Sequence, residues 1–419
     1  MFSTRRARRT ALVLAMSAVT AVALTACSGS PGSTSSSSSG LALKIGTILP
    51  QTGTLAALGP PEIEGVNLAV ADANKAKAGI TVSAIQKDSG DTTTNIATQS
   101  VTSLLSSKVS AIVGAASSSV SLTVIDQITK AKVVQFSPAN TSPAFSTYKD
   151  NGYYWRDAPS DVLQGRVLGQ KVLKDGAINI AILYQNDSYG QGLNDNVKKA
   201  ISSGGGTVTS DVSYDPAATN FATEVSKSLA SKPDAFIVIS FTQIKSIVQE
   251  IDKAGYPFSK VYGSDGNYGV IDPSFKNVDI AGMQFTNPGV VATAAFKTRL
   301  QAQASADGAK ALTSFNYAPE AYDAVTLISL AALVGGATDG TTIKNNLQQV
   351  SEGGTKCTSF AACAKLVKAG TKNIDYDGLS GPITFDANGD PSQAYVTIYK
   401  YAKGNTNSAT GSEFGDLTK

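Results

Sequence analysis

Two apolar runs that each end in small hydroxyl residues constrain the fold of this chain more than any other feature. Ala111 to Val113 leads into Gly114-Ala-Ala-Ser-Ser-Ser, and Val133 to Phe136 leads into Ser137-Pro-Ala-Asn-Thr-Ser. Such runs are typical of buried parallel strands that open into a loop at their carboxyl ends. Because apolar residues at helical spacing lie between the two runs, the segment predicts a strand, helix, strand unit with its polar loops at one sheet edge.

Ser118 and Ser119 stand where the helix of this unit is expected to begin. Their hydroxyls and the free backbone N–H groups of the first helical turn would face a common point, and the helix dipole favours an anion there. The serines could instead serve only as N-caps of the helix. A second hydroxyl loop, residues 137–142, is expected at the same edge, and this favours a ligand over caps alone.

The alternation of strands and helices continues along the chain and restarts once. With 419 residues there is room for two domains. The rhythm restarts near Tyr153-Tyr-Trp-Arg-Asp-Ala-Pro159, so we expect two lobes of similar α/β construction with parallel, doubly wound sheets. The expected strands cover residues 43–49, 80–86, 111–113, 133–136, 178–184, 207–214 and 235–240, and a short strand ends at 263.

The last third of the chain has a different pattern. Two helices are expected, Ala294 to Ala302 and Ala318 to Val334. The second is apolar almost all round and should be buried. The segments 381–391 and 395–401 are expected to form a turn-linked pair of strands.

The amino terminus is typical of an exported protein. Residues 1–26 combine four arginines with an apolar core that is too short to span a membrane, which predicts a removable signal peptide. Leu24-Thr25-Ala26-Cys27 resembles the lipobox of bacterial lipoproteins, so Cys27 is the expected lipidation site. Residues 27–40 are rich in serine and glycine and predict a flexible tether. The export route, general secretory or twin-arginine, stays open.

Composition excludes several classes of function. Without residues 1–26 the chain keeps 31 basic and 32 acidic side chains, so it lacks the positive charge that nucleic-acid binding requires. There is no histidine, which excludes a Ser-His-Asp relay and histidine-containing metal triads. In an exported protein the remaining cysteines, Cys357 and Cys363, predict a small-loop disulfide rather than half a metal site.

Seven short motifs in order resemble the leucine/isoleucine/valine-binding proteins, the substrate-binding components of branched-chain amino-acid ABC importers. The resemblance runs from about Leu43 to Tyr401. It is carried by Thr52-Gly, Gly65-Val-Asn-Leu-Ala-Val, Gly114 with Ser117-Ser-Ser, Phe136-Ser-Pro-Ala-Asn-Thr, Asn186-Asp-Ser-Tyr-Gly-Gln-Gly, Ala321-Tyr-Asp-Ala and Gly381-Pro-Ile-Thr-Phe-Asp with a later Gly-Asp.

The resemblance implies a type I periplasmic-binding-protein fold, in which two Rossmann-like lobes are joined by a three-segment hinge. It assigns residues 41–158 and 288–380 to lobe 1, and residues 159–287 and 381–410 to lobe 2. It further implies that the hydroxyls of Ser118 and Thr141 bind a ligand carboxylate and that the carbonyl of Ala139 accepts from the ligand ammonium.

The facing side of the site differs from the family pattern. Asp265 stands where the family has a glutamate that pairs with the ammonium, although Gly-Ser-Asp-Gly also suits a plain turn. Tyr189 matches a tyrosine that covers the ligand, whereas nearby Asp187 suits a turn or a cap. Leu58 replaces one family tyrosine, and either Ser240 or Phe241 replaces another.

The function implied is that of an extracytoplasmic, lipid-anchored receptor for a branched-chain or related aliphatic amino acid. Its expected partner is an ABC permease, with no cofactor, metal or nucleic acid, and we expect a monomer. One alternative keeps the fold and binds an amide, urea or an aromatic or organic acid. An extracellular enzyme and a sensory module are further alternatives, and the absence of histidine disfavours the enzyme.

Overall fold

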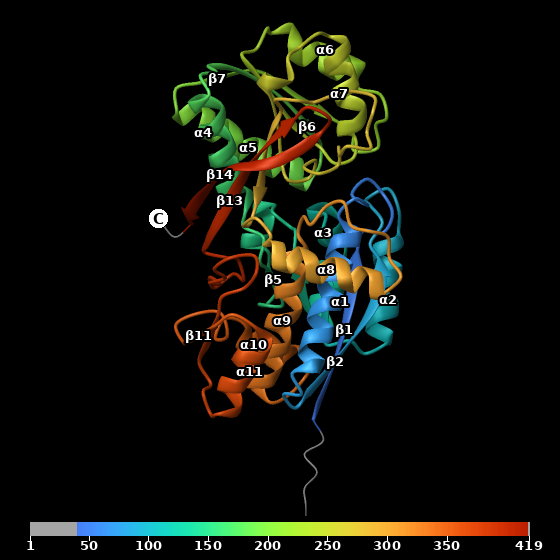
Figure 1. The fold of residues 1–419 in the computed structure, drawn as a ribbon, viewed down its shortest axis with the longest axis vertical. Helices are drawn as coiled ribbons and strands as arrows, with labels where there is room; N and C mark the ends of the chain where they lie inside the picture. Colours follow the sequence, from blue (N-terminus) through green and yellow to red (C-terminus); the bar gives the residue numbers. More distant parts are fainter. Residues whose placement is uncertain (1–39, 418–419) are drawn as a thin grey trace, which may run out of the picture. The chain divides into compact units, whose positions relative to one another are not determined.

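The computed structural model describes residues 40–417, which fall within one compact unit of the chain (Figure 1). The predicted signal at 1–26, the lipidation site Cys27 and the tether at 27–40, except Gly40, lie outside the described residues. The described part is built on two large β-sheets, each covered by helices. The predicted fold class, α/β with two lobes, is confirmed.

The first lobe contains a five-stranded parallel sheet in the order β2-β1-β3-β4-β5. Strands β3 (Ala111–Gly114) and β4 (Val134–Ser137) are buried along their whole length and enclose helix α3 (Ser118–Lys130). The strand, helix, strand unit is therefore confirmed. Pairing of Ala111 with Val134 brings the loops after both strands to one edge. The other strands are β1 (Leu41–Leu49), β2 (Ile80–Asp88) and β5 (Tyr154–Arg156).

Helices from both ends of the chain cover this sheet, so the blue and orange segments of Figure 1 lie side by side. The apolar helix expected near residue 318 is buried over nearly its whole length, as predicted. Gly65 lets it approach closely, because a Cβ there would lie 2.5 Å from the carbonyl oxygen of Ala318. The helices are α1 (Gly59–Lys75), α2 (Ile96–Ser106), α8 (Ala294–Ala306), α9 (Ala318–Gly335), α10 (Gly340–Leu347) and α11 (Phe360–Lys368), with a 3-10 turn η1 (Pro143–Thr147).

The second lobe contains a seven-stranded sheet in the order β14-β13-β10-β9-β8-β6-β7. Strand β13 pairs antiparallel with β10 and with β14, and the other pairings in this sheet are parallel. Its strands are β6 (Asn179–Gln185), β7 (Thr207–Tyr214), β8 (Ala235–Ile239), β9 (Val261–Gly263), β10 (Gln284–Pro288), β13 (Gln393–Ala402) and β14 (Thr406–Asp416). Its helices are α4 (Asp161–Lys174), α5 (Ser188–Ser203), α6 (Ala222–Ala230) and α7 (Ile244–Lys253), with a 3-10 turn η2 (Phe258–Lys260).

The chain passes between the two sheets three times. The first passage follows β5, the second follows β10, and the third lies between Tyr376 and Gln393. These passages correspond to the three-segment hinge that the family resemblance implied. The residue boundaries assigned to the two lobes stay a prediction.

The carboxyl-terminal strands differ from expectation. Strand β13 pairs with β14, whereas the segment 381–391 forms a single bridge between Phe385 and Pro391. The reason is a tight turn, in which the carboxylate of Asp386 accepts from the backbone N–H groups of Asn388 and Asp390. Strand β14 is exposed and polar along most of its length, so it gives no alternating apolar signal.

A two-stranded sheet was not expected. It pairs β11 (Thr355–Cys357) with β12 (Ile374–Tyr376), beside α11. The predicted disulfide between Cys357 and Cys363 is confirmed and ties β11 to that helix.

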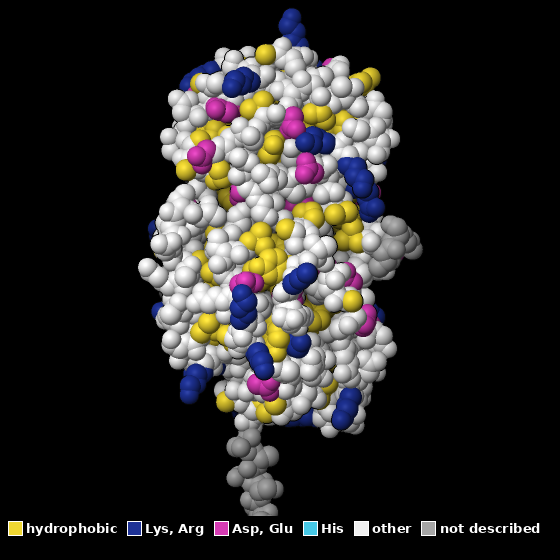
Figure 2. Space-filling model, turned by 180° about the vertical axis from the view of Figure 1, so that it is seen from behind, with side chains coloured by type: hydrophobic (Ala, Val, Ile, Leu, Met, Phe, Trp, Pro, Cys, Tyr) yellow, Lys and Arg dark blue, Asp and Glu magenta, His cyan; other side chains and the backbone are white. Residues whose placement is uncertain are grey.

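Charged side chains of both signs are interspersed on the face shown in Figure 2, without a continuous basic patch. Within residues 40–417, no single helix is long and apolar enough to cross a membrane, and α9 with α10 meets the length and composition requirement only as a pair bent by 103°.

Candidate ligand-binding site

The two hydroxyl loops of the first lobe are tied to each other by hydrogen bonds. Ser137 Oγ donates to the carbonyl of Ala115 at 2.7 Å and accepts from the N–H of Asn140 at 2.9 Å. The side-chain amide of Asn140 donates to the carbonyl of Ala116 at 2.7 Å. The loops after β3 and β4 therefore form one rigid unit at the sheet edge.

The serines at the start of α3 have separate roles. Ser117 is the N-cap, and its Oγ accepts from the N–H of Val120. Ser118 Oγ accepts from the N–H of Ser142 at 3.3 Å, so it joins the two loops. Ser119 Oγ accepts from the N–H of Ser188 at 3.0 Å and so reaches α5 of the second lobe. Ser118 and Ser119 are thus at the helix start, as predicted, but neither is its N-cap.

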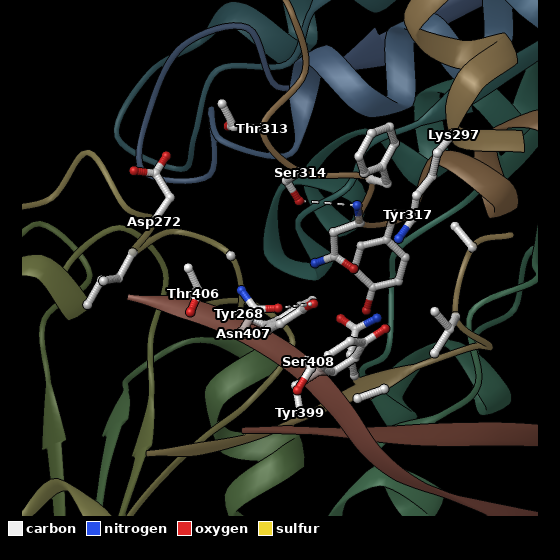
Figure 3. Close-up of a pocket in the computed structure, with 18 of the residues that line it drawn as sticks. Tyr268, Asp272, Lys297, Thr313, Ser314, Tyr317, Tyr399, Thr406, Asn407 and Ser408 are labelled. Atoms are coloured by element: carbon white, nitrogen blue, oxygen red, sulfur yellow. Dashed lines mark hydrogen bonds between the residues drawn. The ribbon is translucent and has the colours of Figure 1, made fainter. Parts of the chain in front are cut away.

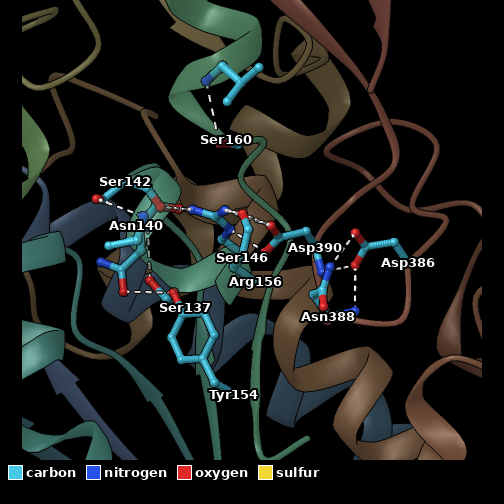
Figure 4. A network of polar contacts seen from close by, with 12 residues as sticks. Ser137, Asn140, Ser142, Ser146, Tyr154, Arg156, Ser160, Asp386, Asn388 and Asp390 are labelled. Carbon is cyan, nitrogen blue, oxygen red and sulfur yellow. Dashed lines mark hydrogen bonds and ion pairs between the residues drawn. The ribbon is translucent and has the colours of Figure 1, made fainter. Parts of the chain in front are cut away.

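A buried ion pair holds the second loop in position (Figure 4). Arg156, at the end of β5, donates to both carboxylate oxygens of Asp390, at 2.6 and 2.8 Å. Its remaining donors reach the carbonyls of Asn140 at 3.2 Å and Ser142 at 2.8 Å. The backbone on both sides of Thr141 is therefore fixed. The Thr141 hydroxyl itself is buried and has no hydrogen-bond partner among the described residues.

The carboxylate of Asp265 faces this edge from the second lobe. Its Oδ1 accepts from Tyr189 Oη at 2.7 Å and from Gln164 Nε2 at 2.9 Å, while its Oδ2 accepts from Tyr317 Oη at 2.7 Å. All three donors are neutral. Burial raises the pKa of Asp265, and these hydrogen bonds offset only part of that rise. The side chain of Asn267 also holds the Gly-Ser-Asp-Gly turn, because its Oδ1 accepts from the N–H of Ser264.

Asp161 is a second buried acid that the sequence did not single out. It lies in the first turn of α4, where its N–H donates to the carbonyl of Thr141 at 2.7 Å. Neither carboxylate oxygen has a hydrogen-bond partner among residues 40–417. Burial raises the pKa of Asp161 strongly, and the charge of Asp265 raises it further. Two neighbours lower this pKa only in part, first the Thr141 hydroxyl and then Arg156, which is itself paired with Asp390.

Beside Ser118 and Asp265 lies a small cavity of about 10 Å³, enough for about one water molecule. Six of the seven predicted ligand-binding residues line it, and Thr141 lies outside its wall. Phe241, rather than Ser240, is on the wall, where its ring stacks on Tyr189 with centroids 5.3 Å apart. Asp187 caps α5 through the N–H of Gly190, as predicted. The predicted wall residues are Leu58, Ser118, Ala139, Tyr189, Phe241 and Asp265.

Three residues at this site were missed by the sequence reasoning: Asp161, Gln164 and Tyr317. The first two lie one helical turn apart at the start of α4, where Ser160-Asp161 reads as an ordinary helix N-terminus. Their spacing of three, which places both on one helix face, was the only available signal. Tyr317 precedes α9 and reaches Asp265 across the two lobes, and no local pattern marks such a contact.

Across residues 40–417, no group of three or more acidic, cysteine or histidine side chains could hold a metal ion. The site offers the hydroxyl of Ser118 and the start of α3 on one side, the buried carboxylate of Asp265 facing them, and the buried carboxylate of Asp161 near Thr141. This arrangement suits binding of a ligand that carries both signs of charge.

Comparisons with known proteins agree with the fold. A family model described as periplasmic binding protein matches residues 42–406. Leu/Ile/Val-binding protein homolog 3 of Brucella melitensis is 25% identical over 372 residues, which cover 86% of this chain and 92% of that protein. A shorter match, 25% identical over 145 residues, covers 32% of this chain and 35% of an uncharacterized protein of Methanocaldococcus jannaschii.

Two solved structures have the same fold. The branched-chain amino-acid substrate-binding protein LivJ of Streptococcus pneumoniae, in complex with isoleucine, has a TM-score of 0.69 and 23% identity, covering 90% of this chain and 99% of LivJ. A solute-binding protein of an ABC transporter from R. palustris, in complex with 4-hydroxybenzoate, has a TM-score of 0.72 and 18% identity, covering 90% and 98%.

Proposed function

From the premise that this chain belongs to the periplasmic binding protein family, we propose that it is the extracytoplasmic substrate-binding component of an ABC importer and captures a free amino acid. The expected ligand class is a branched-chain or related aliphatic amino acid. Two relatives of this type support that class, the Brucella homolog by its name and LivJ by its bound isoleucine.

One observation carries the zwitterion proposal: the buried carboxylate of Asp265 lines the same small cavity as Ser118 at the start of α3. A second buried carboxylate, that of Asp161, lies near Thr141 outside the wall of that cavity and has no hydrogen-bond partner among residues 40–417. A buried charge without a partner costs several kcal/mol, on the order of 3 to 5 when a partner is removed. A ligand ammonium would supply the missing opposite charge. The ligand carboxylate would then meet Ser118, the start of α3 and the unpartnered hydroxyl of Thr141.

Closure of the two lobes around the ligand follows from the contacts that cross between them. Tyr317 binds Asp265, Ser119 binds Ser188, and Thr242 Oγ1 donates to the carbonyl of Thr54 at 2.8 Å. The amino acid would bind the loops of lobe 1 first, and the second lobe would then close with Asp265, Tyr189 and Phe241. A ligand that contacts both lobes favours the closed state by its differential affinity for that state.

The partner proposed for the closed form is an ABC permease, and the anchor proposed is a lipid on Cys27. Both rest on the family and on the sequence of the first forty residues. We propose no enzymatic activity, because the site has binding groups and no acid–base relay.

A second class of ligand, the aromatic acids, is compatible with the same fold. The R. palustris protein is bound to 4-hydroxybenzoate, which has a carboxylate and no ammonium. The two buried acids of the present chain favour an ammonium-bearing ligand, since an aromatic acid would leave them without a cation. The proposal therefore places amino acids before aromatic acids, amides and urea.

Isothermal titration against a panel of amino acids, amides, urea and benzoates tests the function. We expect heat with at least one amino acid and at least a tenfold weaker affinity for it in Ser118→Ala. Ser107→Ala, at the end of α2, serves as the matched control and should leave the affinity unchanged. Binding of benzoates alone would support the second class, and no heat with any amino acid would contradict the first.

A further inference from the structure

A cavity of about 540 Å³ lies directly behind one wall of the candidate site (Figure 3). The small cavity and this large one share a single lining residue, Tyr317. In Figure 3, Tyr317, Ser314 and Lys297 of the first lobe face Tyr268, Asn407 and Tyr399 of the second. No other cavity described for residues 40–417 shares a wall residue with the small one. Tyr317 therefore separates the small cavity from the large one.

The side chain of Tyr317 is buried in a hydrophobic cluster with Tyr189 and Phe241, and its polar contact is with Asp265. Its hydroxyl makes one hydrogen bond among the described residues, to Asp265 Oδ2 at 2.7 Å. Its backbone has φ of 57°, the left-handed conformation that residues other than glycine adopt at a cost. The preceding Asn316 also binds the second lobe, through a long contact of 3.4 Å to the Asp265 carbonyl. Tyr317, which separates the two cavities, is thus hydrogen-bonded directly to Asp265, the predicted partner of the ligand ammonium.

An ammonium group would compete with Tyr317 for the same oxygen. Burial and the charge of Asp265 raise the pKa of Tyr317 well above its usual value, so the phenol is a neutral donor. Hydrogen bonds from a charged donor to a carboxylate are about twice as strong as neutral ones. A ligand ammonium at Asp265 would displace the phenol, and the ring would lose its only polar anchor.

The large cavity has the chemistry to receive a bulky side chain. Tyr268 and Tyr399 form a stacked pair with centroids 4.2 Å apart, and Phe315 lies under Lys297 Nζ at 5.3 Å. Hydroxyl and amide groups complete the lining, from Thr313, Ser314, Asn407 and Ser408. Aromatic faces with scattered polar groups suit an aromatic or long, partly polar side chain. The small cavity, by contrast, has no room for any side chain.

We propose that Tyr317 is a ligand-operated gate: the ammonium of an amino acid releases it from Asp265, and the ligand side chain then enters the large cavity. This inference rests on the proposed function, the binding of a free amino acid, and shifts the expected side chain from a branched aliphatic one to an aromatic or long one. The protein selects amino acids with aromatic or long side chains over those with short ones.

Isothermal titration with alanine, leucine, phenylalanine and tryptophan tests the gate. For the unaltered protein we expect the affinity to rise at least tenfold from alanine to phenylalanine or tryptophan. Ser408→Trp places a large ring in the big cavity from an exposed position, so it should weaken phenylalanine binding at least tenfold and leave alanine binding unchanged. Thr219→Trp, in a different inter-lobe cavity, is the matched control and should change neither affinity.

The variant Tyr317→Phe distinguishes between a gating role of the Tyr317 hydroxyl and a purely structural one. The ring stays, but its competition for Asp265 is lost, so phenylalanine should bind several-fold more tightly. Equal weakening of alanine and phenylalanine in Tyr317→Phe would overturn the gate, as would unchanged phenylalanine affinity in Ser408→Trp. Failure of the proposed function looks different: the unaltered protein would then bind none of the four amino acids. A thermal melt of each variant checks that it is folded.

Discussion

Arg156 and Asp390 join two of the three passages between the lobes. Arg156 ends β5 at the first passage, Asp390 lies in the turn before β13 at the third, and two short hydrogen bonds connect them in a fully buried position. Because Arg156 also binds the carbonyls on either side of Thr141, the ion pair links the hinge to the predicted carboxylate site.

Removing the partner of Arg156 should therefore destabilise the protein strongly. Asp390→Ala leaves a buried guanidinium without its counter-ion, and we expect the free energy of unfolding to fall by about 3 to 5 kcal/mol. Urea denaturation measures this change. Asp126→Ala breaks an exposed ion pair with Lys130 and should lower the free energy of unfolding far less than Asp390→Ala does. Equal effects of the two variants would contradict the structural role of the buried pair.

Glu320 should make stability depend on pH. Burial raises the pKa of Glu320 to about 8, from an ordinary value of 4.5. Two more buried acids, Glu62 and Asp157, lie close to it, and their carboxylates have no hydrogen-bond partner among residues 40–417. Between pH 4.5 and 8 the folded state holds a proton that the unfolded state has released. The free energy of unfolding should therefore fall as pH rises, by up to about 1.4 kcal/mol per pH unit from this group.

Glu320→Gln should reduce this slope and stabilise the protein most at pH 8, while the other buried acids with raised pKa values keep part of the slope. Thermal melts at pH 5, 6.5 and 8 would detect the change. Glu413→Gln, on the exposed part of β14, is the matched control and should leave the slope as it is. A slope that persists unchanged in Glu320→Gln would show that other groups cause it.

Much of the fold could be predicted from the sequence, because its signals are local. Apolar runs of four to nine residues become buried strands, and helical spacing of apolar residues identifies α3, α5 and α9. Strand β14 was missed because a polar edge strand has no buried face to reveal it. Helices α10 and α11 are short and lie in a segment for which the sequence reasoning assigned no elements.

The candidate site was predictable only in part. Ser118 and Ala139 follow strand ends, where ligands bind in parallel α/β sheets. The family resemblance added Leu58, Tyr189, Phe241 and Asp265, all of which line one cavity. Asp161 and Tyr317 reach the site only through the packing of the two lobes, and their burial is a tertiary property that no local pattern encodes.

Replacing Asp161 by asparagine should raise the stability of the protein and lower its affinity for amino acids. The buried carboxylate of Asp161 has no hydrogen-bond partner among residues 40–417, so Asp161→Asn should raise the melting temperature at pH 7. The same change removes a negative charge from the proposed ammonium site and should weaken amino-acid binding by about tenfold or more, equivalent to about 1.4 kcal/mol. Melting curves and titration together test both halves. A variant that melts higher and binds with unchanged affinity would make Asp161 a structural residue only.

Amino-acid affinity should fall as pH is lowered. Burial raises the pKa values of Asp265 and Asp161, and protonation of either carboxyl competes with the ligand ammonium. Binding is therefore strongest where both are ionised in the complex, and it should weaken progressively as the pH is lowered. Titration in buffers of different ionisation enthalpy would detect proton release on binding at the lower pH. Absence of any proton release, with constant affinity, would argue against a carboxylate partner.

The central claim is that the site holds both charged ends of an amino acid. Isothermal titration of phenylalanine and leucine, each beside two analogues, is the decisive measurement. The analogues that lack the ammonium are 3-phenylpropanoate for phenylalanine and 4-methylpentanoate for leucine. The analogues that lack the carboxylate are phenethylamine for phenylalanine and 3-methylbutylamine for leucine. We predict that at least one amino acid binds and that both of its analogues bind at least a hundredfold more weakly, a difference of about 2.7 kcal/mol or more. Equal affinity for an amino acid and either analogue would contradict the account.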